Sequence, residues 1–310
     1  MSTIDISKFH VIAVVSNPVR YRSRWELFRQ FQTRMLQAGV NLTTVELVFG
    51  ARTPFLTTEH QRHVRLRSYD ELWHKENLIN IGISRLPEDW EYVAWIDADV
   101  QFVRPDWVEE TIHQLQHYMI VQMWETAADL GPRNEIFATY KSFGSLLVDG
   151  QAVSPSWKKY GYEYPHTGYA WAARREAIEI MGGLLDKAVL GAADHHMAWS
   201  FLGQGLKSCP PKIHPNYTKM VAEWQTRAAK LKRDIGFVPG SLLHYWHGKK
   251  KDRKYVDRWQ VLIKNGFDPE KHLVRGVNGL YEWSDSTPIG LRDGVRAYMR
   301  QRHEDSIDLL

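Results

Sequence analysis

Short apolar runs rich in β-branched residues alternate, in the first half of the chain, with longer segments whose apolar positions recur at helical spacing. Residues 11–16, 43–49 and 92–96 are such runs, and each predicts a buried strand. Residues 118–123 and 145–148 are further strand candidates. Strands that alternate with helices in this way predict an α/β fold with an open, largely parallel sheet.

The segments between these strands predict helices that flank the sheet. Residues 72–86 predict a helix that Pro87 ends, and Pro105 opens another. The helix after the first strand ends before Gly39 and has four apolar residues at near-helical spacing: Trp25, Phe28, Phe31 and Met35.

The pattern changes after about residue 205, where a proline-rich stretch begins. A basic helical segment follows at 223–233, and a helical tail is predicted over about 290–304. We therefore divide the chain into an α/β core, 1–205, and a basic C-terminal segment, 206–310, which either stand apart or form one integrated domain.

The composition is that of a globular protein: of 310 residues, 44% are hydrophobic and 25% are charged, which excludes disorder as the main state. Cys209 is the single cysteine, so an internal disulfide and a cysteine-built zinc site are both excluded. No stretch approaches the roughly 18 apolar residues of a membrane-spanning helix. The opening residues carry no targeting pattern. The expected location is the cytoplasm, or the host cytoplasm for a viral protein.

The positive charge is concentrated late in the chain. Residues 207–310 contain 20 Lys and Arg against 12 Asp and Glu, whereas residues 1–206 contain 20 against 24. A basic C-terminal third suits phosphates, nucleic acid or another anionic surface. The alternative is a solvated lysine-rich face.

Two carboxylates, Asp97 and Asp99, directly follow the apolar run 92–96. In extended backbone, positions i and i+2 point the same way, so both carboxylates are expected to converge at the carboxyl end of a strand. That edge is where open α/β sheets bind ligands. A divalent cation between the carboxylates would also bring substrate phosphates. The alternative is a polar turn after a buried strand.

This run resembles the D-x-D motif of GT-A-fold glycosyltransferases, which bind a nucleotide-sugar through Mn²⁺ or Mg²⁺. The lead-in at residues 73–80 is also similar to theirs. The resemblance implies a GT-A-like sheet with Asp99 as the main metal ligand. Asp97 would either contact the ribose or share the metal. A UDP-sugar is the favoured donor.

Residues 244–249 bring two imidazoles, a glycine and a lysine together. They are similar to the late His-x-x-Gly-x-Lys segment of GT-A enzymes. The resemblance implies that His247, or alternatively His244, completes the metal shell, while Gly248 and Lys249 hold the diphosphate. The alternative is a surface loop. By the same resemblance, the other donor-binding candidates are Asn17, Arg20, Tyr21, Arg24, Arg67, Lys75 and Asn80. The alternatives are a basic helix N-terminus after the first strand and, for Lys75 and Asn80, the surface of a helix.

Residues 166–176 and 182–197 resemble the acceptor-side segment of the same enzymes. The resemblance places Asp194 under the sugar. There it would take the acceptor's proton in an inverting enzyme, or only hold a substrate in a retaining one. Asp194 also suits a helix cap. The acceptor-binding candidates are Trp124, Trp171 and His195, for which core or surface positions are the alternatives.

The sequence therefore predicts a metal-dependent glycosyltransferase. Its acceptor is expected to be either a hydroxymethylated DNA base, as for viral DNA-modifying enzymes, or a saccharide. The rival functions are a nucleotidyltransferase and a non-catalytic nucleic-acid-binding protein. The absence of Gly-x-Gly-x-x-Gly, Walker A, His-Glu-x-x-His and Gly-x-Ser-x-Gly motifs disfavours several other enzyme classes. The sequence leaves open the sugar, the base of the donor, retention or inversion, and the oligomeric state.

Overall fold

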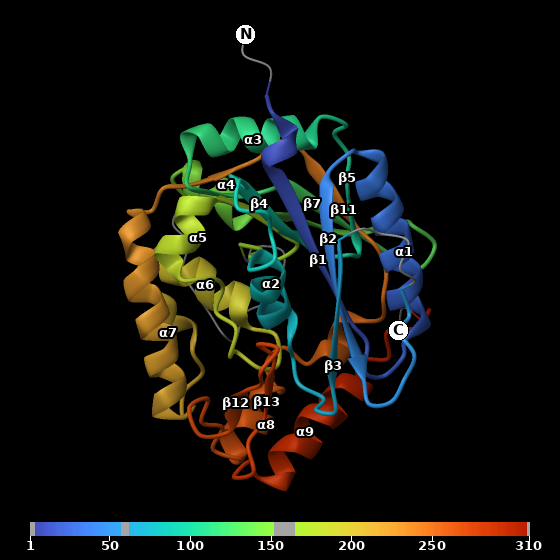
Figure 1. The fold of residues 1–310 in the computed structure, drawn as a ribbon, viewed down its shortest axis with the longest axis vertical. Helices are drawn as coiled ribbons and strands as arrows, with labels where there is room; N and C mark the ends of the chain where they lie inside the picture. The colour runs from blue at the N-terminus through green and yellow to red at the C-terminus, as the bar shows by residue number, and fades with distance from the viewer. Residues whose placement is uncertain (1–3, 57–61, 152–164, 309–310) are drawn as a thin grey trace.

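A seven-stranded sheet forms the centre of the protein in a computed structural model that describes residues 4–56, 62–151 and 165–308 (Figure 1). Only β9 runs antiparallel to its neighbours within this sheet, and every other pairing is parallel. Its spatial order is β10 (Ile235–Phe237), β6 (Ile120–Gln122), β9 (Ala170–Arg174), β4 (Tyr92–Ile96), β1 (Phe9–Ser16), β2 (Asn41–Phe49), β3 (His63–Ser68).

Helices cover both faces of this sheet because successive side chains of β1 point to opposite sides. Val11 and Ala13 belong to a core that includes α1 (Arg22–Gln37) and α3 (Trp107–His117). Ile12 belongs to the other core, which includes α2 (Lys75–Ile83). Three helices after β9 also contribute to it: α5 (Arg175–Met181), α6 (Ala193–Phe201) and α7 (Pro215–Ala228). The predicted α/β class with a largely parallel sheet and flanking helices is confirmed.

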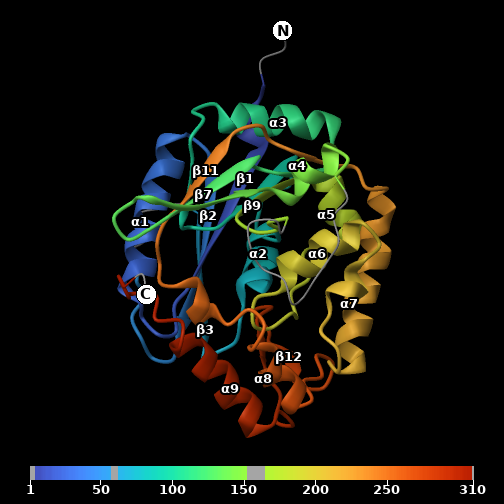
Figure 2. The ribbon, with the colours of Figure 1, turned by 180° about the vertical axis from the view of Figure 1, so that it is seen from behind.

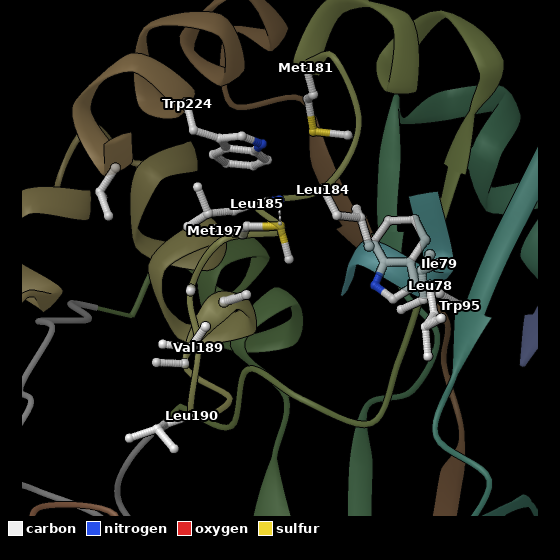
Figure 3. Packing of buried hydrophobic residues seen from close by; sticks show 14 of the residues in the cluster. Leu78, Ile79, Trp95, Met181, Leu184, Leu185, Val189, Leu190, Met197 and Trp224 are labelled. Carbon is white, nitrogen blue, oxygen red and sulfur yellow. Dashed lines mark hydrogen bonds between the residues drawn. The ribbon is translucent and has the colours of Figure 1, made fainter. Parts of the chain in front are cut away.

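The larger core is filled by long apolar side chains from the sheet and from these helices. Figure 3 shows Trp224 of α7, Met197 of α6 and Trp95 of β4 around the loop that contains Leu184 and Leu185. The sulfur of Met197 accepts a hydrogen bond from the Leu185 backbone N–H, at 3.4 Å. This packing fixes α6, and therefore Asp194 in its first turn, relative to β4.

A second, four-stranded sheet lies beside the first. Its order is β5 (Val100–Phe102), β11 (Ser241–His244), β7 (Thr126–Leu130), β8 (Ile136–Lys141). A short hairpin of β12 (Leu273–Arg275) and β13 (Tyr281–Trp283) lies with α8 (Trp259–Lys264) and α9 (Ile289–Arg300) at the end of the molecule opposite α3 (Figure 1). Strands β10 and β11 come from the basic C-terminal segment, so both sheets contain residues from each side of position 205.

The sequence-based prediction of a strand at 145–148 is wrong. These residues belong to the helix α4 (Phe143–Val148), and Ser142 is its N-cap residue. The Ser142 hydroxyl accepts a hydrogen bond from the Ser145 backbone N–H at 3.0 Å, as a helix cap does. A short apolar run does not distinguish a strand from a buried helical turn, so the capping serine was the informative signal. The prediction also lacked β3, which is an edge strand of the sheet and comes before β4 in the sequence.

No helix in the described part of the chain combines the length and the apolar character that crossing a membrane requires.

Candidate metal centre and ligand cavity

A cavity of about 520 Å³ opens at the carboxyl end of β1 and β4. These strands are parallel neighbours, so the loop after Ser16 and the turn after Ile96 lie at the same edge of the sheet. The volume falls within the range of about 300–1,000 Å³ that is usual for small-molecule sites. Residues from both ends of the chain line it, from Val14 to Glu304.

Strand pairing brings Asp99 together with His244. Strand β11 is antiparallel to β5, and its register sets His244 opposite Val100, next to Asp99. The Tyr245 backbone N–H donates to the Asp99 carbonyl at 2.8 Å and continues this pairing. His247 then returns toward the same carboxylate, with its Nε2 at 3.0 Å from Asp99 Oδ2.

The two imidazoles and the carboxylate form a candidate metal centre. The Nε2 atoms of His244 and His247 are 3.1 Å apart, and His244 Nε2 is 3.9 Å from Asp99 Oδ1. Asp99 Oδ1 is buried and has no hydrogen-bond partner among the described residues. A bound cation would give this oxygen and both nitrogens a common partner, so the donor set fits a metal ion.

Asp129 fixes the orientation of His244. The parallel register of β11 with β7 sets these two residues side by side, and Asp129 Oδ1 lies 2.9 Å from His244 Nδ1. Burial opposes the charge of Asp129, but His244 and Lys250 outweigh it, so the pKa of Asp129 lies well below its usual range. An ionised carboxylate only accepts, so Nδ1 carries the proton and the lone pair of Nε2 faces Asp99. Tyr169 completes this arrangement by donating its hydroxyl to Asp129 at 2.7 Å.

Cationic side chains surround the metal centre. The Arg253 guanidinium lies 2.7 Å from His247 Nε2, so a metal ion at that nitrogen would displace it. Lys250 forms an ion pair with Asp129, and Lys251 and Arg302 line the same cavity. Several cations around one metal centre are suited to an anionic ligand such as a diphosphate.

Residues 299–306, which we call the closing segment, form one wall of the cavity. Glu304, whose side chain is 1% exposed, accepts hydrogen bonds from Arg24 at 2.7 Å and from Arg302 at 2.5 Å. The Asp305 carboxylate accepts from the first two backbone N–H groups of α1, at 2.9 and 2.8 Å, and thereby caps that helix. Both ribbon views place the closing segment, at the red end of the colour scale, beside α1 (Figures 1 and 2).

Five of the predicted donor-binding residues line the cavity: Asn17, Tyr21, Arg24, Lys75 and Asp97. The Asn17 side chain accepts from the Tyr21 backbone N–H at 2.9 Å and donates to the Tyr21 carbonyl at 2.7 Å. The Tyr21 hydroxyl donates to carbonyls of the closing segment, and the nearest of these is at 2.7 Å. The loop after β1 is therefore held in place at the cavity wall.

The other predicted donor-binding residues are not among the described residues that line the cavity: Arg20, Arg67, Asn80, Gly248 and Lys249. Arg20 lies over the Trp25 ring at 5.7 Å, and the exposed Arg67 donates to backbone carbonyls, including that of Arg52 at 3.1 Å. The Asn80 side chain accepts from the Leu184 backbone N–H at 2.8 Å and donates to the Leu184 carbonyl at 3.0 Å. These contacts hold loops in place.

Gly248 allows close packing of two chain segments. Its φ is +85°, and a Cβ there would lie 2.9 Å from both the Glu304 Cα and the His303 carbonyl oxygen. The glycine is therefore required by the closing segment, and its role at a phosphate stays a prediction. The lysines of this loop that line the cavity are the next two, Lys250 and Lys251.

Asp97 and Asp99 lie in a turn rather than in extended backbone, and they face different partners. Asp97 forms an ion pair with Lys75, whereas Asp99 faces the two histidines. Asp97 is therefore not part of the candidate metal cluster as it stands in the structure, although both residues line the same cavity. Asp97 as a metal ligand or ribose contact stays a prediction.

Asp194 and His195, in the first turn of α6, both line the cavity. Burial raises the pKa of Asp194, and Lys75 opposes this shift. Burial also lowers the pKa of His195 to about 3, helped by Arg258, so this imidazole is neutral near pH 7. The helix begins after Ala192, and Asp194 accepts a hydrogen bond from the His195 backbone N–H at 2.8 Å.

Trp124 and Trp171 are core residues that the sequence did not distinguish from ligand-binding tryptophans. They are 1% and 5% exposed, and neither lines the cavity in the described part of the chain. The indole of Trp124 donates to the Gly168 carbonyl at 3.3 Å, and that of Trp171 donates to the Thr167 carbonyl at 2.8 Å. Both tryptophans therefore support the segment beneath the cavity, and their assignment to acceptor binding finds no geometric support.

Several residues of the site were assigned no individual role from the sequence: Glu76, Asp129, His166, Tyr169, Arg253, Arg258, Arg302 and Glu304. Glu76, His166 and Tyr169 nevertheless lie within segments that the resemblance singled out. Several of the late basic residues are used within the protein. Arg233 donates to the Leu202 carbonyl at 3.1 Å, and the 6% exposed Arg258 donates to the Gly191 carbonyl at 3.0 Å. The basic charge of the C-terminal third is therefore not all available to a surface partner.

No family model and no curated protein matches this chain. Among solved structures, it is similar to the catalytic domain of a Drosophila β1,4-galactosyltransferase 7 bound to xylobiose, with 13% identity and a TM-score of 0.36. The match covers 74% of this chain and 64% of that one, so this chain spans less than two thirds of the galactosyltransferase structure.

Two bacterial structures are similar at the same low level. One, from Desulfovibrio desulfuricans G20, is assigned as a nucleotide-diphospho-sugar transferase and has 13% identity, a TM-score of 0.37, and coverage of 96% of this chain and 98% of that one. The other is the 4-diphosphocytidyl-2C-methyl-D-erythritol synthase of Anaerococcus prevotii, with 10% identity, a TM-score of 0.33, and coverage of 76% and 88%. Function is therefore inferred from the residues of the site.

Proposed function

We propose that this protein is a metal-dependent glycosyltransferase that uses a nucleotide-sugar donor. The observation that supports this most directly is the cluster of Asp99, His244 and His247 inside a cavity lined by cations. A metal bound there would supply positive charge for the diphosphate of the donor. The cavity volume of about 520 Å³ is sufficient for a ligand of nucleotide-sugar size.

In this proposal, different side chains around the cluster bind the diphosphate, hold the nucleoside and accept the proton. Lys250 and Lys251 bind the diphosphate and stabilise the charge of the departing nucleoside diphosphate. Tyr21 and Arg24, at the loop after β1, hold the nucleoside. Asp194 accepts the proton of the attacking hydroxyl, since its burial raises its pKa and makes it a stronger base than an exposed aspartate.

A panel of UDP-, GDP- and CMP-sugars with Mn²⁺ tests this proposal, with release of the nucleotide as the measurement. Release of a nucleoside diphosphate, or of CMP from a CMP-sugar, supports glycosyl transfer. Release of pyrophosphate from a nucleoside triphosphate and a sugar phosphate would instead identify a nucleotidyltransferase. For the acceptor, the hydroxymethylated DNA base and the saccharide both stay predictions.

We expect the site to bind Mn²⁺ more tightly than Mg²⁺, by about tenfold or more, because two of its three ligands are imidazoles. Mg²⁺ prefers oxygen ligands and keeps most of its water. Titration calorimetry with each metal on the purified protein measures the ratio. The exposed histidine His113 provides the control, since His113→Ala should leave both affinities unchanged. Equal affinity for the two metals would contradict the proposed ligand set.

A further inference from the structure

The turn after β4 separates two parts of the cavity that differ in charge. On the side of Asp99 lie the metal centre and most of the cations. On the side of Asp97, three carboxyl groups interact with a single ammonium group, and we call this set the acidic corner: Lys75, Glu76, Asp97 and Asp194. The proposed function uses Asp194 from this set but gives no role to Glu76.

Glu76 is a buried carboxyl group at the wall of the cavity. It lies in the first turn of α2 and is 6% exposed. No other described residue donates a hydrogen bond to its carboxyl oxygens; the one backbone donor that interacts with them is its own N–H. Its carboxyl oxygens are not among the buried atoms of the described residues that lack a partner, so they are open to the cavity, where a bound ligand can donate hydrogen bonds to them.

We propose that Glu76 is a specificity-determining residue that accepts hydrogen bonds from hydroxyl groups of the transferred sugar. The acidic corner thereby selects a neutral, polyhydroxylated sugar over one that carries a carboxylate. This inference rests on the proposed function, because it assumes that a nucleotide-sugar occupies the cavity. It adds the chemical class of the sugar, which neither the metal centre nor the comparisons define.

Charge explains the direction of this selection. A sugar hydroxyl donates to a carboxylate, whereas a uronic acid brings a second negative charge and no donor at that position. Lys75 already has carboxylate partners and is not available to a uronate. The charges of Asp97, Glu76 and Asp194 outweigh the effect of burial and raise the pKa of Lys75 above its usual value. Arg258, which also faces Asp194, bonds the Tyr298 hydroxyl at 3.2 Å and the Gly191 carbonyl at 3.0 Å. Both cations near the acidic corner thus have partners.

The protonation of Glu76 agrees with this role. Burial raises its pKa to about 7, and Lys75 only partly offsets this shift. Near neutral pH the group therefore alternates between a carboxylate, which accepts hydrogen bonds, and a neutral acid, which also donates one. Both forms can bond a hydroxyl group, and the charged form repels a carboxylate.

Donors that differ only at C6 provide the test. Free UDP and GDP are first titrated into the protein with Mn²⁺, to establish which nucleotide it binds. The hexose and the hexuronate of that nucleotide are then compared, as UDP-glucose with UDP-glucuronate or GDP-mannose with GDP-mannuronate. We expect the neutral donor to bind at least about tenfold more tightly than the uronate.

The variant Glu76→Gln removes the charge and keeps the size of the side chain. We expect it to weaken binding of the neutral donor about tenfold, to reduce the preference over the uronate, and to leave the affinity for the free nucleotide unchanged. The exposed Glu88 provides the matched control, and Glu88→Gln should behave as the unaltered protein. If Glu76→Gln does not fold, the affinities of the unaltered protein for the neutral donor and for the uronate still test the proposal.

The possible results separate the two proposals. Binding of neither nucleotide would overturn the proposed function for UDP- and GDP-sugar donors, and this inference with it. Nucleotide binding with equal or tighter binding of the uronate would overturn this inference alone. The same would follow if Glu76→Gln kept the full preference for the neutral donor. A preference that falls in Glu76→Gln while nucleotide affinity is retained supports the assignment.

Discussion

Replacing Asp99 by alanine is expected to abolish detectable Mn²⁺ binding and to lower donor turnover by on the order of a thousandfold. Asp99 is the only carboxylate in the candidate metal cluster of the described residues, and both histidines face it. Without it, only two imidazoles remain in the cluster, and an imidazole ligand supplies no negative charge. Titration with Mn²⁺ and an assay of nucleotide release measure the two effects.

The exposed Asp285 serves as the control for this prediction, because it is not among the described residues that line the cavity and Asp285→Ala removes the same carboxyl group. Circular dichroism should show that both variants remain folded. If Asp99→Ala retained metal-dependent turnover, the metal would bind elsewhere, and the cluster of Asp99, His244 and His247 would lose its proposed role.

Replacing Glu304 by alanine is expected to lower the free energy of unfolding by about 3–5 kcal/mol, because it leaves two arginines without their buried counter-charge. The Glu304 side chain is 1% exposed, and it bonds both Arg24 and Arg302. Urea unfolding followed by tryptophan fluorescence measures the loss. The exposed Asp308 is a nearby control, and Asp308→Ala should change the stability little. A loss below about 1 kcal/mol would show that the ion pairs contribute little.

The stabilisation by Glu304 should also depend on pH. Burial disfavours its charge, but Arg24 and Arg302 outweigh burial, so its pKa in the folded protein is well below the usual value. Its stabilising contribution is therefore complete above the pKa of the unfolded chain, near 4.3, and is lost as the pH falls toward the folded value. The difference between the unaltered protein and Glu304→Ala should shrink as the pH falls below about 4.

The sequence predicted the sheet better than the site. Strands β1, β2 and β4 are apolar runs of β-branched residues, and such runs bury both faces of a parallel sheet. Strand β3 alternates arginines with apolar residues at an edge, which is a weaker signal. The apolar run at 145–148 was misassigned because its length suits a strand and a helical turn equally.

The metal cluster was only partly predictable. Asp99 and the two histidines lie in recognisable segments, but the sequence treated the histidines as alternatives. Their joint position depends on the register of β11 with β5 and β7, which no local pattern defines. Asp129 and Glu304 were not linked to the metal cluster for the same reason. Each acts through a partner more than 50 residues away, as the pairing of Asp129 with His244 across 115 positions illustrates.

The closing segment sets the time at which the cavity is completed during protein synthesis. Its wall, and the carboxylate that holds Arg24, come from residues 299–306, while the loop they contact comes from residues 17–24. A ribosome would therefore have to release the residues up to about 306 before any ligand met a finished pocket. A stop codon ahead of residue 299 should yield a product with an open, inactive cavity.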